Sequence, residues 1–158
     1  MARYTVKTMG VSASHDRMNG GPNALFGLNR SSYHDERSTL NGYVIAGTTK
    51  LGGGVVHRKN TSAAGFSSNL FYAGVLFPYS ALVSFDAQIA HLNVQHSDND
   101  ASILALRATY HFSKRTAAYL TAGHIRNEGA SALAVSPGAT TLAGMDQSGV
   151  MVGMRHAF

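Results

Sequence analysis

Several short stretches contain the residue types that catalytic or metal sites use, but none has the spacing that such chemistry requires. Residues 65–69 include serines but lack the second glycine of a nucleophile elbow. Residues 52–54 are glycines without the Lys-Ser/Thr pair of a phosphate-binding loop, and residues 98–100 lack the glycine and distal glutamate of an EF-hand. The eight histidines form no His-x-His or Glu-x-x-His pair of the kind that zinc sites use. We therefore expect no enzymatic activity, no metal and no cofactor.

Charged and polar residues occur instead at alternate positions of otherwise apolar segments. Alternation with a period of two indicates β-strands whose two faces meet different environments. The polar face of these segments carries Asp86, Gln88, Arg107, His111 and Arg155. Such side chains either steer a passing solute or form structural ion pairs with one another, as Arg107 and Asp86 would, and the sequence leaves both open.

The last twelve residues show this alternation up to the carboxy terminus. One face of the segment 147–158 carries Val150, Val152, Met154, His156 and Phe158, whereas the other is small apart from Arg155. An alternating apolar strand that ends on Phe is similar to the closing strand of a Gram-negative outer-membrane barrel. The alternative is an ordinary last strand of a soluble β-sandwich.

The composition restricts the classes of protein that remain. The 158 residues fit one domain, and only 13% are charged while 44% are hydrophobic. Mean hydropathy is −0.06 and no apolar run approaches the ~18–20 residues of a transmembrane helix. Barrel strands that alternate lipid-facing and lumen-facing residues give such a neutral average.

The charges and the amino terminus exclude further classes. The thirteen Lys and Arg residues give a net charge of +5 but are scattered, so no nucleic-acid interface is expected. Cysteine is absent, which excludes a disulfide scaffold. Residues 1–7 show no apolar stretch and no small-residue cleavage site, so we expect no signal peptide in this chain.

The same alternation and the positions of Gly, Pro and Asn predict eight antiparallel strands and no helix that spans a membrane. The predicted strands are residues 4–15, 39–48, 51–59, 69–77, 81–93, 101–112, 116–126 and 147–158. Their connections alternate between long loops and short turns, and a sandwich has no reason to do this. The long loops are residues 16–36, 60–68, 95–100 and 127–146, and the short turns lie at residues 49–50, 78–80 and 113–115. Outer-membrane barrels have this arrangement, so we predict an all-β antiparallel transmembrane barrel.

Four segments are similar to one family of such barrels. Residues 105–119 (Ala-Leu-Arg-Ala-Thr-Tyr-His-Phe-Ser-Lys-Arg-Thr-Ala-Ala-Tyr) combine an aromatic-rich strand, a Ser-Lys-Arg-Thr turn and a second strand. Residues 69–75 (Asn-Leu-Phe-Tyr-Ala-Gly-Val), residues 85–88 (Phe-Asp-Ala-Gln) and residues 149–158 occur in the same order. Together they resemble the trimeric general-diffusion porins of β-proteobacteria. The match runs from Lys50 to Phe158 and is weaker over residues 1–49.

The resemblance implies a function and a set of partners. Porins of this kind have about sixteen strands, so the chain resembles only their carboxy-terminal half and reads as a fragment of one porin-like domain, residues 1–158. The implied function is passive diffusion of small hydrophilic solutes or ions across the outer membrane. The implied partners are outer-membrane lipid, two further copies in a homotrimer, and the barrel-assembly machinery, which would bind the carboxy-terminal strand. The resemblance also points Arg58 into the pore, and it places the inward-folded constriction loop in the half that is not present. The residues expected to line the pore are Arg58, Asp86, Gln88, Arg107, His111 and Arg155.

Two other functions fit the sequence as well. A closed eight-stranded barrel could act as a surface adhesin through its long loops, because the interior of such a barrel is filled by side chains. A soluble β-sandwich could act as a binding module.

Overall fold

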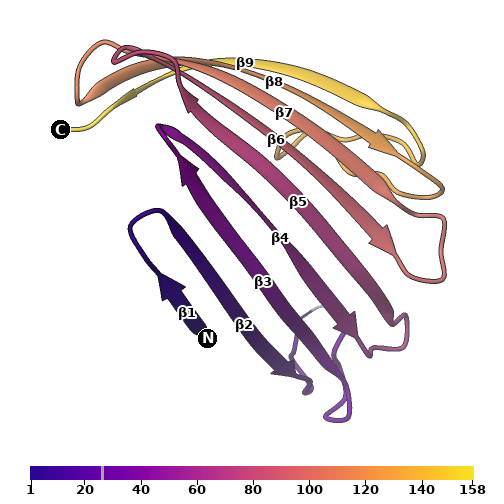
Figure 1. Cartoon of the computed structure of the whole chain (residues 1–158). Helices are drawn as coiled ribbons and strands as arrows, with labels where there is room; N and C mark the ends of the chain where they lie inside the picture. Colours follow the sequence, from indigo (N-terminus) through magenta and orange to yellow (C-terminus); the bar gives the residue numbers. More distant parts are fainter. Residues whose placement is uncertain (26) are drawn as a thin grey trace.

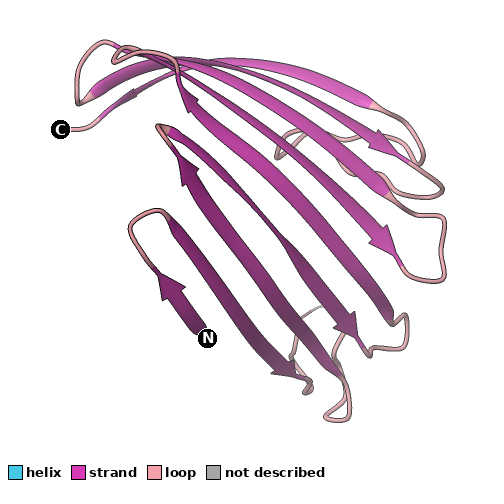
Figure 2. Ribbon diagram, in the orientation of Figure 1, coloured by secondary structure: helices cyan, strands magenta, loops and turns pink. Residues whose placement is uncertain are grey.

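The computed structural model describes residues 1–25 and 27–158, which form one arched antiparallel sheet (Figure 1). Each strand pairs with the next along the chain, so the order in the sheet is the order in the sequence. The strands are β1 (Ala2–Thr5), β2 (Met9–Asn19), β3 (His34–Ala46), β4 (Thr49–Asn60), β5 (Phe66–Pro78), β6 (Val83–Val94), β7 (Ala101–His111), β8 (Thr116–Asn127) and β9 (Gln147–His156). Figure 2 shows strands and loops only, and no described helix is long and apolar enough to cross a membrane. The predicted all-β antiparallel fold is confirmed.

The predicted number of eight strands is wrong, because the first predicted strand is two strands. A turn at residues 6–8, closed by a 2.8 Å hydrogen bond from the Val6 N–H to the Met9 carbonyl, separates β1 from β2. This turn contains no Gly, Pro or Asn, so the sequence carries none of the usual turn signals there. The chain also forms a single sheet rather than two packed sheets, so the β-sandwich alternative is wrong.

Several predicted strand ends also need correction. β2 extends to Asn19 and β3 starts at His34. Residues 16–19 and 34–36, at the two ends of the predicted loop 16–36, therefore belong to strands. The first short turn lies at residues 47–48 instead of 49–50, where Gly47 has a φ of 61° that side chains disfavour. The predicted alternation between long loops and short turns is present in the structure. Figure 1 shows the longer loops, after β2, β4, β6 and β8, at one end of the sheet and the short turns at the other.

The two faces of the sheet differ in chemistry. We call the face that carries a groove lined by Asn41, Asp86 and Arg107 the inner face, and the opposite one the outer face. Strand register carries this assignment across the sheet, since successive side chains alternate between faces. The outer face between its two ends is apolar and solvent-exposed, with Leu40, Val44, Phe71, Ile89, Leu104, Leu106, Leu120, Val150 and Val152 among its members.

Few side chains are buried, because one sheet has no second layer against which to pack. The buried apolar residues are Leu28, Ala90, Ala101, Ala117 and Ile125. An exposed apolar band of this extent is unusual in a soluble domain but is what a lipid-facing surface requires. Because the outer face is apolar, a functional site is expected on the opposite, polar inner face.

Candidate functional site

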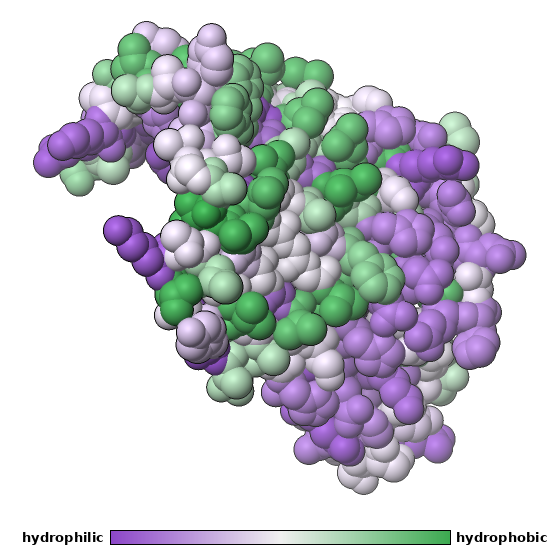
Figure 3. Space-filling model, viewed as in Figure 1, coloured by the Kyte–Doolittle hydropathy of each residue, from purple (hydrophilic) through white to green (hydrophobic). Residues whose placement is uncertain are grey.

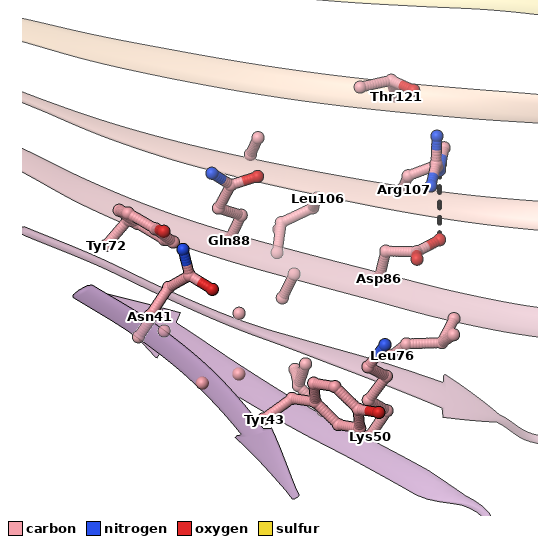
Figure 4. Close-up of a pocket in the computed structure, with 18 of the residues that line it drawn as sticks. Asn41, Tyr43, Lys50, Tyr72, Leu76, Asp86, Gln88, Leu106, Arg107 and Thr121 are labelled. Carbon is pink, nitrogen blue, oxygen red and sulfur yellow. Dashed lines mark hydrogen bonds and ion pairs between the residues drawn. The ribbon is translucent and has the colours of Figure 1, made fainter. Parts of the chain in front are cut away.

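The inner face holds a groove of about 600 Å³ between β3 and β9. Figure 4 shows its polar side chains reaching from β3 to β8 over a floor of glycine and alanine. The floor is open because Gly52 and Gly74 lie beside each other in register, and neither carries a side chain. The polar lining consists of Asn41, Tyr43, Lys50, Tyr72, Asp86, Gln88, Arg107 and Thr121.

Asp86 and Arg107 form an ion pair in this groove. They are direct cross-strand partners on β6 and β7, and Arg107 Nε lies 3.0 Å from Asp86 Oδ2 (Figure 4). Both side chains are partly exposed, at 51% for Arg107 and 26% for Asp86, so the pair stays accessible to solute. On β4 Lys50 Nζ lies 4.1 Å from the centroid of the Tyr43 ring, a cation–π distance. The groove thus contains one neutralised pair and one further cation.

A second cluster lies on the inner face nearer the long loops. Asp35, which is only 2% exposed, accepts hydrogen bonds from Arg58 Nε and Nη2 and from Asn60 Nδ2. Arg37 Nε lies 3.6 Å from the same carboxylate, and the Arg58 guanidinium lies 5.0 Å from the Phe66 ring centroid. A buried carboxylate is stable only when it is paired in this way. This cluster holds β3 and β4 in register at the point where they leave the apolar band.

The connection between β8 and β9 (residues 128–146) is pinned to the inner face. Asn127, 4% exposed, donates from Nδ2 to the carbonyls of Leu133 and Met145 and accepts at Oδ1 from the Leu133 N–H. A Cβ added at Gly123 would lie 2.8 Å from Val135 Cγ2, so the glycine leaves room for the loop. The carboxy-terminal part of the chain therefore brings an inward-folded segment of its own.

Within the described residues, no group of three or more histidine and acidic side chains is placed to hold a metal ion. The chemistry available on the inner face is hydrogen bonding and charge, from fixed side chains on rigid strands.

Comparison with known proteins agrees with this geometry. The family model described as Gram-negative porin matches residues 1–130. The chain belongs to the Gram-negative porin family. Proteins of this family lie in the outer membrane. A solved structure, the anion-selective porin from Comamonas acidovorans, is similar with a TM-score of 0.86 and 26% sequence identity over 99% of this chain. The chain spans 47% of the length of that porin. No curated protein sequence matches the chain.

All six residues predicted to line the pore lie on the inner face of this porin chain. Asp86, Gln88 and Arg107 come together in the groove, whereas Arg58 belongs to the Asp35 cluster. His111 Nε2 lies 3.3 Å from Ser84 Oγ, and Arg155 is the cross-strand partner of Ala117 on β8. Their role in lining a pore remains a prediction.

The carboxy-terminal signature lies on the opposite face. Val150, Val152, Met154 and His156 are exposed on the outer side of β9, and the Phe158 ring lies beyond the strand, 4.8 Å between centroids from His156. Its role in assembly remains a prediction.

Sequence reasoning missed two residues of the inner face. Asp35 lies in a segment predicted to be loop, and its partner Arg58 is 23 residues away. Asn127 was placed at the start of a loop, and its partners lie within and beyond that loop. Strand register could have revealed Asp35, whereas the partners of Asn127 depend on how the loop between β8 and β9 folds.

Proposed function

We propose that this porin chain forms part of the wall of a water-filled pore for passive diffusion of small hydrophilic solutes, with a preference for anions. No bond is made or broken in such a process. The side chains set only the width and the charge of the path.

The net positive charge of the inner face is the main support for this proposal. By register, six basic side chains on the strands point inward, namely Arg3, Arg37, Lys50, Arg58, Arg107 and Arg155. Three acidic side chains point inward on the same strands, namely Asp16, Asp35 and Asp86. The difference of three positive charges favours anions in a confined path. The similar porin from Comamonas acidovorans is titled anion-selective, which supports the same preference.

The proposal includes the surroundings of the pore. The outer face would contact outer-membrane lipid through its apolar band. The whole protein would assemble as a homotrimer, and the strand ending in Met154, His156 and Phe158 would be the segment that the barrel-assembly machinery binds. These partners are supported by family membership and by the exposed carboxy-terminal strand.

The test is a hybrid barrel in which this chain replaces the matching part of the Comamonas acidovorans porin. We expect stepwise conductance in planar bilayers and a reversal potential in a salt gradient that reports anion preference. Replacing three inward cations (K50Q, R107Q and R155Q) should reduce that preference.

The matched control removes the same number of cations from the outer face (R17Q, K59Q and R126Q) and should leave the reversal potential unchanged. A hybrid that folds without conducting would contradict the proposed function. Equal shifts in the two triple variants would contradict the assignment of the inner face as the pore wall.

A further inference from the structure

A row of polar side chains crosses the outer face where the apolar band ends on the long-loop side. We follow the first polar outward residue beyond the band on eight consecutive strands, β2 to β9. From strand to strand, histidine alternates with a short polar residue, which is serine or, on β5, asparagine. The members of this histidine row are His15, Ser38, His57, Asn69, His91, Ser102, His124 and Ser148.

The row marks a boundary in the chemistry of the outer face. On the short-turn side of each member, the next outward residue is apolar, as with Ala13, Val55, Ile89 and Ala122 beside the four histidines. On the long-loop side, two residues beyond, stand Arg17, Lys59, Asn93 and Arg126. In Figure 3 hydrophobic side chains gather across the middle of the face shown, and hydrophilic ones gather toward the lower right, where Figure 1 places the long loops after β2 and β4. The histidines therefore stand at the depth where lipid tails meet headgroups.

Each histidine of the row is hydrogen-bonded at Nδ1 to a neighbouring side chain. This bond is compatible with both the neutral and the protonated ring. Nδ1 lies 3.0 Å from Ser38 Oγ in His15, 2.8 Å from Asn69 Oδ1 in His57, 2.9 Å from Ser102 Oγ in His91 and 2.9 Å from Ser148 Oγ in His124. An amide oxygen only accepts, so the Nδ1 of His57 carries a hydrogen. The four Nε2 atoms have no hydrogen-bond partner within the described part of the chain. Protonation therefore adds a donor at Nε2 without breaking the bond at Nδ1.

The charges beside the row nearly cancel when the histidines are neutral. Arg17 pairs with Glu36 at 3.0 Å, and His34 lies 3.5 Å from the same carboxylate. Lys59 is the register partner of Glu36. Asp100 interacts electrostatically with His91. Near His124, Arg126 lies 3.5 Å from Glu128, and Asp146 accepts from the Asn127 N–H at 3.2 Å. Three basic side chains thus face four acidic ones, and four protonated histidines would make the boundary net positive.

We propose that the histidine row binds the phosphate groups of anionic lipid headgroups, and that it does so mainly when the histidines are protonated. Imidazole changes charge between about pH 5 and pH 8. This inference rests on the proposed function only in that the outer face must contact lipid.

The extent of the row argues for lipid as the occupant. The row crosses eight strands, from His15 on β2 to Ser148 on β9. Its neighbouring members are direct cross-strand partners except between β5 and β6 and between β7 and β8, where the row steps by two residues. A protein partner, such as another copy in the proposed trimer, would cover one sector of a barrel, whereas lipid contacts the rest of its outer surface.

The experiment titrates short-chain phosphatidylglycerol into the full chain in uncharged maltoside micelles and follows each histidine by side-chain NMR. Each cation near an anionic surface strengthens binding roughly five-fold. Four protonated rings should therefore tighten binding by at least about tenfold at about pH 5 compared with about pH 8. The resonances of His15, His57, His91 and His124 should shift, and short-chain phosphatidylcholine should not reproduce the effect.

Three variants make the test specific. Replacing the four row histidines by glutamine should remove the pH dependence and the tight binding. Replacing them by lysine should give tight binding at both pH values. The control H96N changes a loop histidine whose φ of 60° asparagine tolerates, and it should bind like the unchanged chain.

Equal affinity at both pH values, or no loss in the glutamine variant, would overturn the proposal. Equal binding of inorganic phosphate would show a free-anion site and would overturn it as well. If the chain alone shows no β-sheet circular dichroism in micelles, the same titration is carried out on the hybrid barrel. A hybrid that conducts without discriminating lipids contradicts this inference alone, whereas one that binds anionic lipid without conducting contradicts only the proposed function.

Discussion

Along β7, neighbouring residues meet two different environments. Leu104, Leu106 and Ala108 face outward, where the two leucines are exposed, while Arg107 faces inward and pairs with Asp86. The outer face is uniformly apolar between its two ends, so the type of residue defines it there. The inner face depends on particular pairs, each fixed by strand register. On the outer face, stability should therefore depend on whether a residue is apolar. On the inner face, stability should depend on which particular residue is present.

A matched pair of substitutions in one strand tests this difference most strongly. A108R places a cation on the outer apolar band and should cost about 2–4 kcal/mol of unfolding free energy in bilayers. A105R places the same side chain on the inner face and should change it by no more than about 0.5 kcal/mol. Urea unfolding of both variants in lipid vesicles measures the difference. Equal costs would mean that the two faces are not lipid and water.

The pinned loop on the inner face tests dependence on identity. N127A removes the acceptor and the donors that hold Leu133 and Met145, and should cost about 1–3 kcal/mol because these groups are buried. Limited proteolysis should then cut within residues 128–146. The control N19A removes an exposed asparagine at the end of β2, whose side chain accepts a hydrogen bond from Arg17 Nε, and should leave both stability and cleavage unchanged. An uncut loop in N127A would show that the packing of Val135 against Gly123 holds the loop without Asn127.

The smallest effect is expected beyond the strands, at Asp100. Hydrogen bonds from the Val94 N–H at 2.8 Å and from the Asn93 amide at 3.0 Å hold the pKa of Asp100 below its usual range. A lowered carboxyl pKa stabilises the fold above the unfolded value, about 3.9, and this contribution is lost as the pH falls through the lowered value. D100N should therefore lower the melting temperature slightly at pH 7 and reduce the loss on acidification below about pH 4. Melting curves at both pH values check this, and an unchanged acid dependence would contradict it.

The sequence predicts the outer face better than the inner one, for a physical reason. Alternation alone places Phe71, Phe85, Leu106 and Val152 on one face, because burial in lipid depends on residue type. The contact of Asp35 with Arg58 depends on which residues lie opposite each other across strands, and local pattern does not contain that register. The same holds for the histidine row, whose members are separated by long intervals in the sequence.

Two other misses have different causes. The turn at residues 6–8 lacks the residues that usually mark turns, so β1 and β2 appeared as one strand. The ends of β2 and β3 continue past the apolar band with polar residues on both faces, as at Arg17 and Glu36, so they appeared as loop. Strands that extend beyond a membrane lose the alternation by which strands are identified.

The number of strands has a consequence for how the sheet can be completed. Nine is odd, so β1 and β9 both run from the long-loop end to the short-turn end. Placing β9 of one copy beside β1 of another would make the two parallel, unlike every pairing within the chain. A closed ring with only antiparallel neighbours needs an odd number of additional strands, of which the first and last run in the opposite direction. Together these give the even total found in bacterial barrels. Two copies of this chain would give eighteen strands with parallel neighbours wherever β9 meets β1, so they cannot form such a ring.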